Sequence, residues 1–254
     1  MLQAHSFLWH YGWIAPNILT GVLAVCIWWR GIQKRYPVFF YYLIFASLEG
    51  LCLYALDVAP AVSAETWWYA FWVGSILEAL LKFLVIAEVL HHLLHPWPSV
   101  ARVGRNLVSG AGVILVLLAS VASAFAAPDN THWLIEGGHV LSQALYLTEA
   151  GAIVFIFILA ACFKLPWDRM SFGISLAFAV VWCEHLAAWA LIAGGLVRNR
   201  GWGDLSFMGT YHLGVLIWFY YLLVPHRITT NSTVSLPEND LAVWNRELER
   251  LLHQ

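Results

Sequence analysis

Long apolar runs alternate with short polar segments along most of the chain. A helix needs about 20 mainly apolar residues to cross roughly 30 Å of hydrocarbon. Seven runs meet this requirement, and each is bounded by charged residues, prolines or glycines. The predicted membrane helices cover residues 13–31, 38–57, 67–94, 106–127, 134–163, 172–194 and 207–225. The pattern predicts an all-α, polytopic membrane protein in which residues 1–226 form a seven-transmembrane-helix bundle.

Composition excludes a soluble protein. Apolar residues make up 61% of the 254 residues and charged residues 11%, whereas soluble domains have about 45–50% and about 25%. So few charged side chains cannot cover the surface of a soluble enzyme. The net charge of −2 gives no reason to expect a nucleic acid as partner. The partner predicted for most of the surface is the lipid bilayer.

The distribution of lysine and arginine predicts the orientation. Ten of these residues follow the first, third, fifth and seventh runs, and two lie between the sixth and seventh runs. Cytoplasmic loops are enriched in Lys and Arg. We therefore expect the N-terminus outside and the C-terminus in the cytoplasm, in a multi-pass protein of a bacterial cytoplasmic membrane. The first run is too long for a cleavable signal peptide and should remain as an anchor.

Ionisable side chains occur inside the predicted spans, where each costs about 2.5–3.5 kcal/mol at the helix centre. Ser75, Glu78 and Lys82 share one face of their helix, and Ser142, Tyr146 and Glu149 share an arc of another. Glu49 lies on one side of the second span with Tyr42 and Cys52, a side that we expect to turn inward. The candidate ligand-binding or proton-relay residues are Glu49, Glu78, Lys82, Tyr146, Glu149, Glu184, His185 and His212.

Two interpretations of this set stay open. Glu78 and Lys82, at i and i+4, could simply neutralise each other and hold helices together. However, one lysine cannot pair with all of these acids, and unpaired carboxylates would be protonated, ligand-bound or in contact with water. We therefore expect a polar cavity in the outer half of the bundle.

A second cluster, Glu88, His91, His92 and His95, ends the third span. Histidines at i and i+4 can chelate zinc or iron, so a metal ion is the one cofactor that the sequence raises. The run resembles a histidine box of the membrane desaturases and hydroxylases, but those families need several such boxes. Histidine at a helix C-terminus also complements the helix dipole.

Proline placement bears on transport. Pro16 lies near the expected start of the first span, and no predicted span is interrupted by proline near its middle. Many transporters have broken helices at the midplane. The chain also lacks an internal repeat between its first and last three spans. Both observations weigh against a transporter.

The last segment, residues 227–254, is predicted to be a polar linker followed by an amphipathic cytoplasmic helix. Leu241, Trp244, Leu248 and Leu251 follow the a/d spacing of a coiled coil over about two heptads. A helix this short needs a surface to dock on. A cytoplasmic signalling partner, a second copy of the chain or the membrane surface could supply it.

These features lead to three functional hypotheses. The first is a sensor or receptor-like protein that binds a small ligand in the outer cavity and signals through the tail; its topology resembles the seven-helix input regions of bacterial sensor kinases. The second is a small-solute or proton-coupled transporter. The third is a membrane metalloenzyme built on the His91–His95 cluster. No catalytic residue is predicted.

Overall fold

The computed structural model describes residues 6–125, 133–193, 200–224, 243–246 and 249–250. Within these residues the chain is helical and has no strand. The elements are α1 (Phe7–Trp29), η1 (Ile32–Lys34), α2 (Pro37–Val58), α3 (Ala64–Leu93), α4 (Pro98–Ala124), α5 (Trp133–Cys162), α6 (Arg169–Ala193) and α7 (Arg200–Leu223). Each of the seven predicted runs contains one of the α-helices, and each helix begins one to eight residues earlier than expected.

Five of these helices are long and apolar enough to cross a membrane, which makes the chain an integral membrane protein. They are α1, α2, α4, α5 and α6. The other two long helices are more polar, since α3 carries Glu65, Glu78, Lys82 and Glu88 and α7 begins with a glycine-rich polar segment. The apolar side chains on the outside of the bundle suit contact with lipid.

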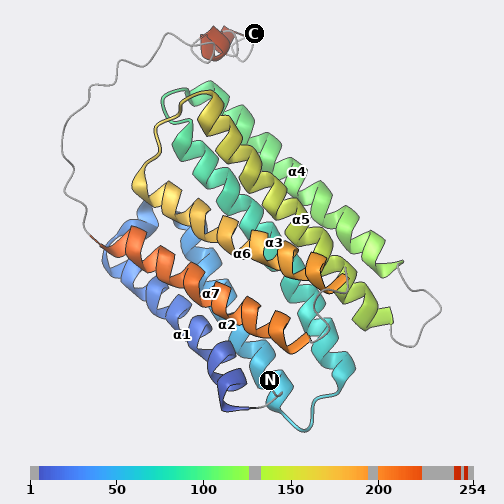
Figure 1. The fold of residues 1–254 in the computed structure, drawn as a ribbon. Helices are drawn as coiled ribbons and strands as arrows, with labels where there is room; N and C mark the ends of the chain where they lie inside the picture. Colours follow the sequence, from blue (N-terminus) through green and yellow to red (C-terminus); the bar gives the residue numbers. More distant parts are fainter. Residues whose placement is uncertain (1–5, 126–132, 194–199, 225–242, 247–248, 251–254) are drawn as a thin grey trace.

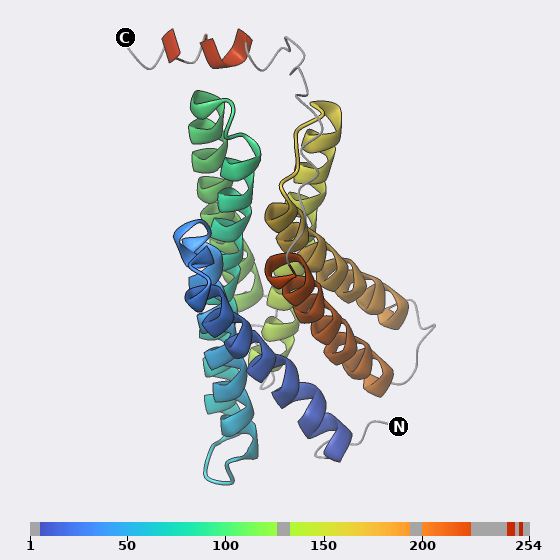
Figure 2. The same ribbon diagram turned by 90° about the vertical axis from the view of Figure 1, so that its left-hand side faces the viewer.

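Six helices form a closed ring, and the seventh lies outside it. Around the ring the order of neighbours is α1, α2, α3, α5, α6 and α7, and α7 packs back against α1. Among the described residues, α4 packs against α3 and α5 and against no other α-helix. Figures 1 and 2 show the helices running up and down, with α4 at one side of the ring. The interior of the ring is therefore built without α4.

Pro16 lies well inside α1, whereas the predicted span placed it near the start of the helix. The helix begins at Phe7 because the Ser6 side chain caps it by accepting a hydrogen bond from the Trp9 N–H at 3.3 Å. Proline has no N–H to donate within the helix. The polar side chains that follow bond to nearby carbonyls: Asn17 Nδ2 donates to Trp13 O at 2.7 Å and Thr20 Oγ1 to Pro16 O at 2.8 Å.

At one end of the bundle, here called the basic end, the residues around η1 are hydrogen-bonded to the start of α6. Asp168 accepts hydrogen bonds from the Tyr36 hydroxyl at 2.9 Å and from Arg35 Nη2 at 3.4 Å. It also caps α6 through the Ser171 N–H at 3.4 Å. Burial raises the pKa of Tyr36, so its hydroxyl stays protonated as a donor.

The same end fixes α7 through its last carbonyl groups. Arg30 donates to Leu223 O, and Arg169 Nη2 donates to Tyr220 O at 3.0 Å. Arg169 also lies over the rings of Tyr220 and Tyr221. Cations at a helix C-terminus complement its dipole and its free carbonyls. The basic end is thus tied together across α1, α2, α6 and α7.

A buried aromatic layer fills the ring next to the basic end. The Phe39 and Phe178 rings each lie 5.3 Å from the ring of Trp218, measured between centroids, and Tyr42 lies 5.4 Å from Phe178. All four side chains are almost fully buried. This layer separates the interior of the ring from the basic end.

Candidate functional site

The ring encloses one well-defined polar cavity of about 250 Å³. It lies at the centre of the ring, on the side of the aromatic layer that faces away from the basic end. Six helices line it, and α4 contributes no residue. The lining includes Asn17 of α1; Tyr42, Glu49 and Gly50 of α2; Ser75, Glu78 and Lys82 of α3; Ser142, Tyr146 and Glu149 of α5; Phe178, Trp182 and His185 of α6; and Phe207, Tyr211 and Trp218 of α7.

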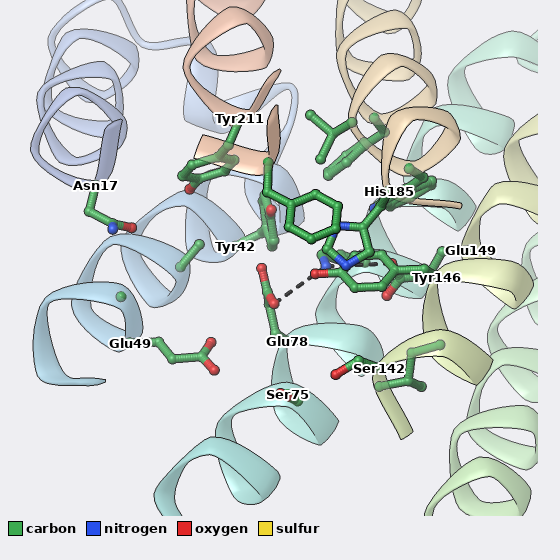
Figure 3. A pocket seen from close by; sticks show the side chains of 18 of the residues that line it. Asn17, Tyr42, Glu49, Ser75, Glu78, Ser142, Tyr146, Glu149, His185 and Tyr211 are labelled. Atoms are coloured by element: carbon green, nitrogen blue, oxygen red, sulfur yellow. Dashed lines mark ion pairs between the residues drawn. The ribbon is translucent and has the colours of Figure 1, made fainter. Parts of the chain in front are cut away.

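Lys82 is the positive centre of the cavity wall. Its Nζ lies 3.3 Å from Glu78 Oε2 and 3.4 Å from Glu149 Oε2. The expected pairing of Glu78 with Lys82 is confirmed. Figure 3 shows Glu78 at the centre of the cavity, with a dashed line marking an ion pair at its carboxylate. The ammonium also lies over the rings of Tyr146 and Trp182, 5.3 and 5.9 Å from their centroids. With a side chain only 8% exposed, Lys82 faces carboxylates and rings rather than open space.

Glu149 is the most deeply buried acid of the site. Its side chain is 1% exposed, although it lines the cavity. Oε2 pairs with Lys82, whereas Oε1 has no hydrogen-bond partner within the described part of the chain. A buried carboxylate oxygen without a donor is costly. The helix pairing of α3 with α5 brings this acid to Lys82, which the spacing along either helix could not indicate.

Two glycines make room for polar side chains of the wall. A Cβ at Gly74 would lie 2.2 Å from Glu49 Oε1, and a Cβ at Gly50 would lie 2.2 Å from Asn17 Oδ1. Glycine at these two positions therefore lets the side chains pass between neighbouring helices. Asn17, Gly50 and Gly74 were not predicted as site residues. A glycine on one helix facing a polar side chain on the next could have indicated these residues. That pattern can be recognised only when it is known which helices are neighbours.

The Glu49 carboxylate differs from Glu78 and Glu149 in its partners. No hydrogen bond or ion pair joins it to the residues that the structure describes. It faces the same part of the cavity as Glu78 in Figure 3. The carboxylates of Glu49 and Glu78 thus line the same part of the cavity. Lys82 is the one lysine or arginine among the described lining residues.

Aromatic rings form most of the remaining wall. The His185 ring lies between the rings of Tyr146 and Phe207, at centroid distances of 3.6 and 3.8 Å. On the opposite side, the Tyr211 hydroxyl is 3.3 Å from Thr20 Oγ1 of α1. The cavity therefore combines carboxylates with the faces and edges of aromatic side chains.

The structure places six of the eight candidate residues around this cavity and two elsewhere. Glu49, Glu78, Lys82, Tyr146, Glu149 and His185 line it. Glu184 instead accepts a hydrogen bond from Ser206 between α6 and α7, and His212 stacks on Tyr11, with ring centroids 5.9 Å apart. Cys52, expected to face inward, is exposed on the outside of α2.

In the cluster at the end of α3 (Glu88, His91, His92 and His95), two side chains hold α3 against the start of α2. Both carboxylate oxygens of Glu88 accept hydrogen bonds from α2, from the Val38 and Phe39 N–H groups at 2.9 Å each. His92 Nε2 donates to Arg35 O at 2.8 Å. Within the described ranges, no group of three or more His, Cys, Asp or Glu side chains could hold a metal ion, and His91, His92 and His95 form no such group with Glu88. Glu88 is a helix cap because α3 places it against the free N–H groups of α2.

Part of the tail lies against the bundle. Asn245 Oδ1 accepts a hydrogen bond from the Ser99 N–H at 3.0 Å, at the first turn of α4, and Asn245 Nδ2 donates to Glu249 Oε1 at 2.9 Å. Trp244 is 63% exposed. The other members of the predicted apolar stripe, Leu241, Leu248 and Leu251, lie outside the described residues. So do Arg198 and Arg227.

The charges of the cavity wall define its chemistry. The cavity wall carries three carboxylates and one ammonium, with histidine counted as neutral. Comparison of the chain with family models, with curated proteins and with solved structures finds no match. The features that bear on function are therefore the geometry of this cavity and the contact of Asn245 with Ser99.

Proposed function

We propose that this protein is a membrane receptor that binds a small ligand in the six-helix cavity and reports binding through its C-terminal tail. The observation that carries the proposal is the course of α3. This one helix supplies Glu78 and Lys82 to the cavity, caps α2 through Glu88, and leads directly into the turn before Ser99, where Asn245 docks.

The proposal includes seven membrane crossings, with the cavity open to the outside and the tail in the cytoplasm. The excess of Lys and Arg at the basic end supports this orientation. A ligand would enter from the end opposite the basic end, because the aromatic layer of Phe39, Tyr42, Phe178 and Trp218 fills the ring on the basic side. The α3 and α7 spans are more polar than the other five because α3 carries four charged side chains and α7 begins with a glycine-rich polar segment.

Transport is the second candidate function. Carboxylates at membrane depth also serve as proton relays in transporters, and Glu49, Glu78 and Glu149 share one cavity. The hydrogen bonds of the basic end and the aromatic layer close the route to the other side of the bundle. We favour a receptor because α3 links the cavity to a docked tail.

A cross-linking experiment tests the receptor. Ser99→Cys and Asn245→Cys are introduced into a full-length chain whose four cysteines are replaced by alanine, and disulfide formation is followed in membranes with and without a library of small metabolites. A receptor ligand changes the rate of cross-linking and is not accumulated by proteoliposomes. Accumulation of the same compound would instead establish transport.

Removal of residues 236–254 provides a second test. The truncated chain should keep its thermal stability and its ligand affinity, because the cavity lies within the ring, but it should lose its output or self-association. An unchanged oligomeric state together with unchanged signalling would remove the tail from the mechanism.

A further inference from the structure

The charges of the cavity identify the kind of ligand that it can take. Lys82 lies between Glu78 and Glu149, at 3.3 and 3.4 Å, so its charge is used within the wall. Three carboxylates and one ammonium leave a surplus of two negative charges, with histidine counted as neutral. An anionic ligand would meet this surplus, and a neutral one would leave it uncompensated. A cation would offset it.

The surroundings of two of these carboxylates, Glu149 and Glu49, support the same conclusion. Glu149 Oε1, in a side chain 1% exposed, lacks a hydrogen-bond donor in the described part of the chain. Glu49 lines the cavity beside Gly74, and among the residues that the structure describes no lysine, arginine or histidine forms an ion pair with it. Unpaired carboxylates at membrane depth are costly enough to require a counter-charge or a proton.

The walls favour an organic cation over a metal ion. No set of three or more His, Cys, Asp or Glu side chains in the described ranges is arranged to hold a metal. Tyr42, Tyr146, Trp182 and Tyr211 instead offer aromatic surface, and Lys82 already lies over two of these rings. Aromatic cages beside a carboxylate are the typical setting for alkylated or protonated amines.

The size of the cavity limits the ligand. Its volume is about 250 Å³, which corresponds to about eight waters at roughly 30 Å³ each. Drug-sized molecules need larger pockets, of roughly 300–1,000 Å³. A ligand with about eight non-hydrogen atoms fits this space.

Resting on the receptor function above, we propose that the ligand is a small organic cation, either a quaternary ammonium or a protonated amine. Its positive centre lies between the carboxylates of Glu49 and Glu78, and its apolar part lies against the aromatic wall. Binding brings a counter-charge to the surplus of negative charge that remains when the three carboxylates of the wall share the single ammonium of Lys82.

Titration calorimetry of the full-length protein in detergent, at constant ionic strength, tests the charge requirement. Choline is compared with its neutral isostere 3,3-dimethylbutan-1-ol, and butylammonium with butan-1-ol; the two pairs distinguish a quaternary from a protonated amine. We expect at least one cation to bind about tenfold or more tightly than its isostere, since an unpaired buried charge is costly. Equal affinity within both pairs, or no binding by either cation, would overturn the proposal.

Two substitutions locate the positive centre. Glu49→Gln should weaken binding of the cation about tenfold or more while leaving the unliganded protein at least as heat-stable as wild type, because it removes an unpaired charge. If Glu49 had only a structural role, the Glu49→Gln variant would instead be less heat-stable than wild type. Glu184→Gln is the matched control: it removes an acid at membrane depth that does not line the cavity, and it should keep wild-type affinity. Wild-type affinity in Glu49→Gln would refute the assignment.

The receptor and the cation can fail separately. If a cation binds but the cross-linking of positions 99 and 245 does not change, the receptor is wrong and the cation site stands. If a neutral or anionic compound changes the cross-linking while neither cation binds, the cation site is wrong and the receptor stands.

Discussion

Lys82 and Glu149 form an ion pair between α3 and α5, with 3.4 Å between Nζ and Oε2 and with both side chains buried. The pair joins two neighbouring helices of the ring at the wall of the cavity. Because the spacing of residues within α3 favours only the Glu78 pairing, the contact with Glu149 is a product of the fold. The free energy of this buried ion pair determines how substitutions at Lys82 and Glu149 change the stability of the protein.

Replacing Lys82 alone should be strongly destabilising. Lys82→Met leaves Glu149 buried and without a counter-charge, and breaking such a pair from one side costs about 3–5 kcal/mol. The apparent melting temperature in detergent should therefore fall. The double variant Lys82→Met with Glu149→Gln should recover most of the loss, since removing both charges is often neutral. A double variant as unstable as the single one would show that Lys82 acts mainly through Glu78.

Gly74→Ala tests whether the position of Glu49, apart from its charge, matters. The new Cβ would lie 2.2 Å from Glu49 Oε1, so the carboxylate must move, at small cost because it is the end of a flexible side chain. We expect weaker binding of the cation and little change in stability. Gly151→Ala is the control, since nothing lies within 4 Å of its Cβ, and alanine should stabilise the helix by about 1 kcal/mol. Equal affinity in the two variants would argue against a fixed place for Glu49.

The helices could be predicted from the sequence because each contains a long apolar run. The contact of Glu78 with Lys82 could be predicted because the two residues lie one turn apart in one helix. The early start of α1 was missed because Phe7–Tyr11 mix polar and apolar residues, although the Ser6 cap gave a local signal. The partnership of Lys82 with Glu149 and the passage of Glu49 beside Gly74 could not be predicted. Both depend on which helices are neighbours, and hydropathy gives no information on that order.

Glu88 should prove important for stability rather than for metal binding. Glu88→Ala removes two charge-assisted hydrogen bonds to the start of α2, and we expect a loss of about 2–3 kcal/mol. Glu88→Gln should lose less, because one acceptor oxygen remains. The measurement is thermal unfolding with and without added zinc. Stabilisation by zinc that depends on His91 and His95 would restore the metal hypothesis.

Topology is testable with reporter fusions. Fusions after residue 254 and within residues 95–105 should read cytoplasmic, and a fusion near residue 130 should read external, because Lys and Arg concentrate at the basic end. A cytoplasmic reading near residue 130 would change the number of crossings and place the cavity on the other side of the membrane.

The close contact of Gly112 with Phe83 has a mechanical consequence for the whole molecule. A Cβ at position 112 would lie 2.5 Å from the Phe83 ring, so α4 approaches α3 more closely than any larger residue would permit. Interfaces packed this tightly do not deform continuously. We therefore expect the two helices to move together, with the charged wall of the cavity on α3 and the contact of Ser99 with Asn245 at the start of α4. If ligand binding displaces α3 at Glu78, we expect this packing to carry the displacement toward Ser99.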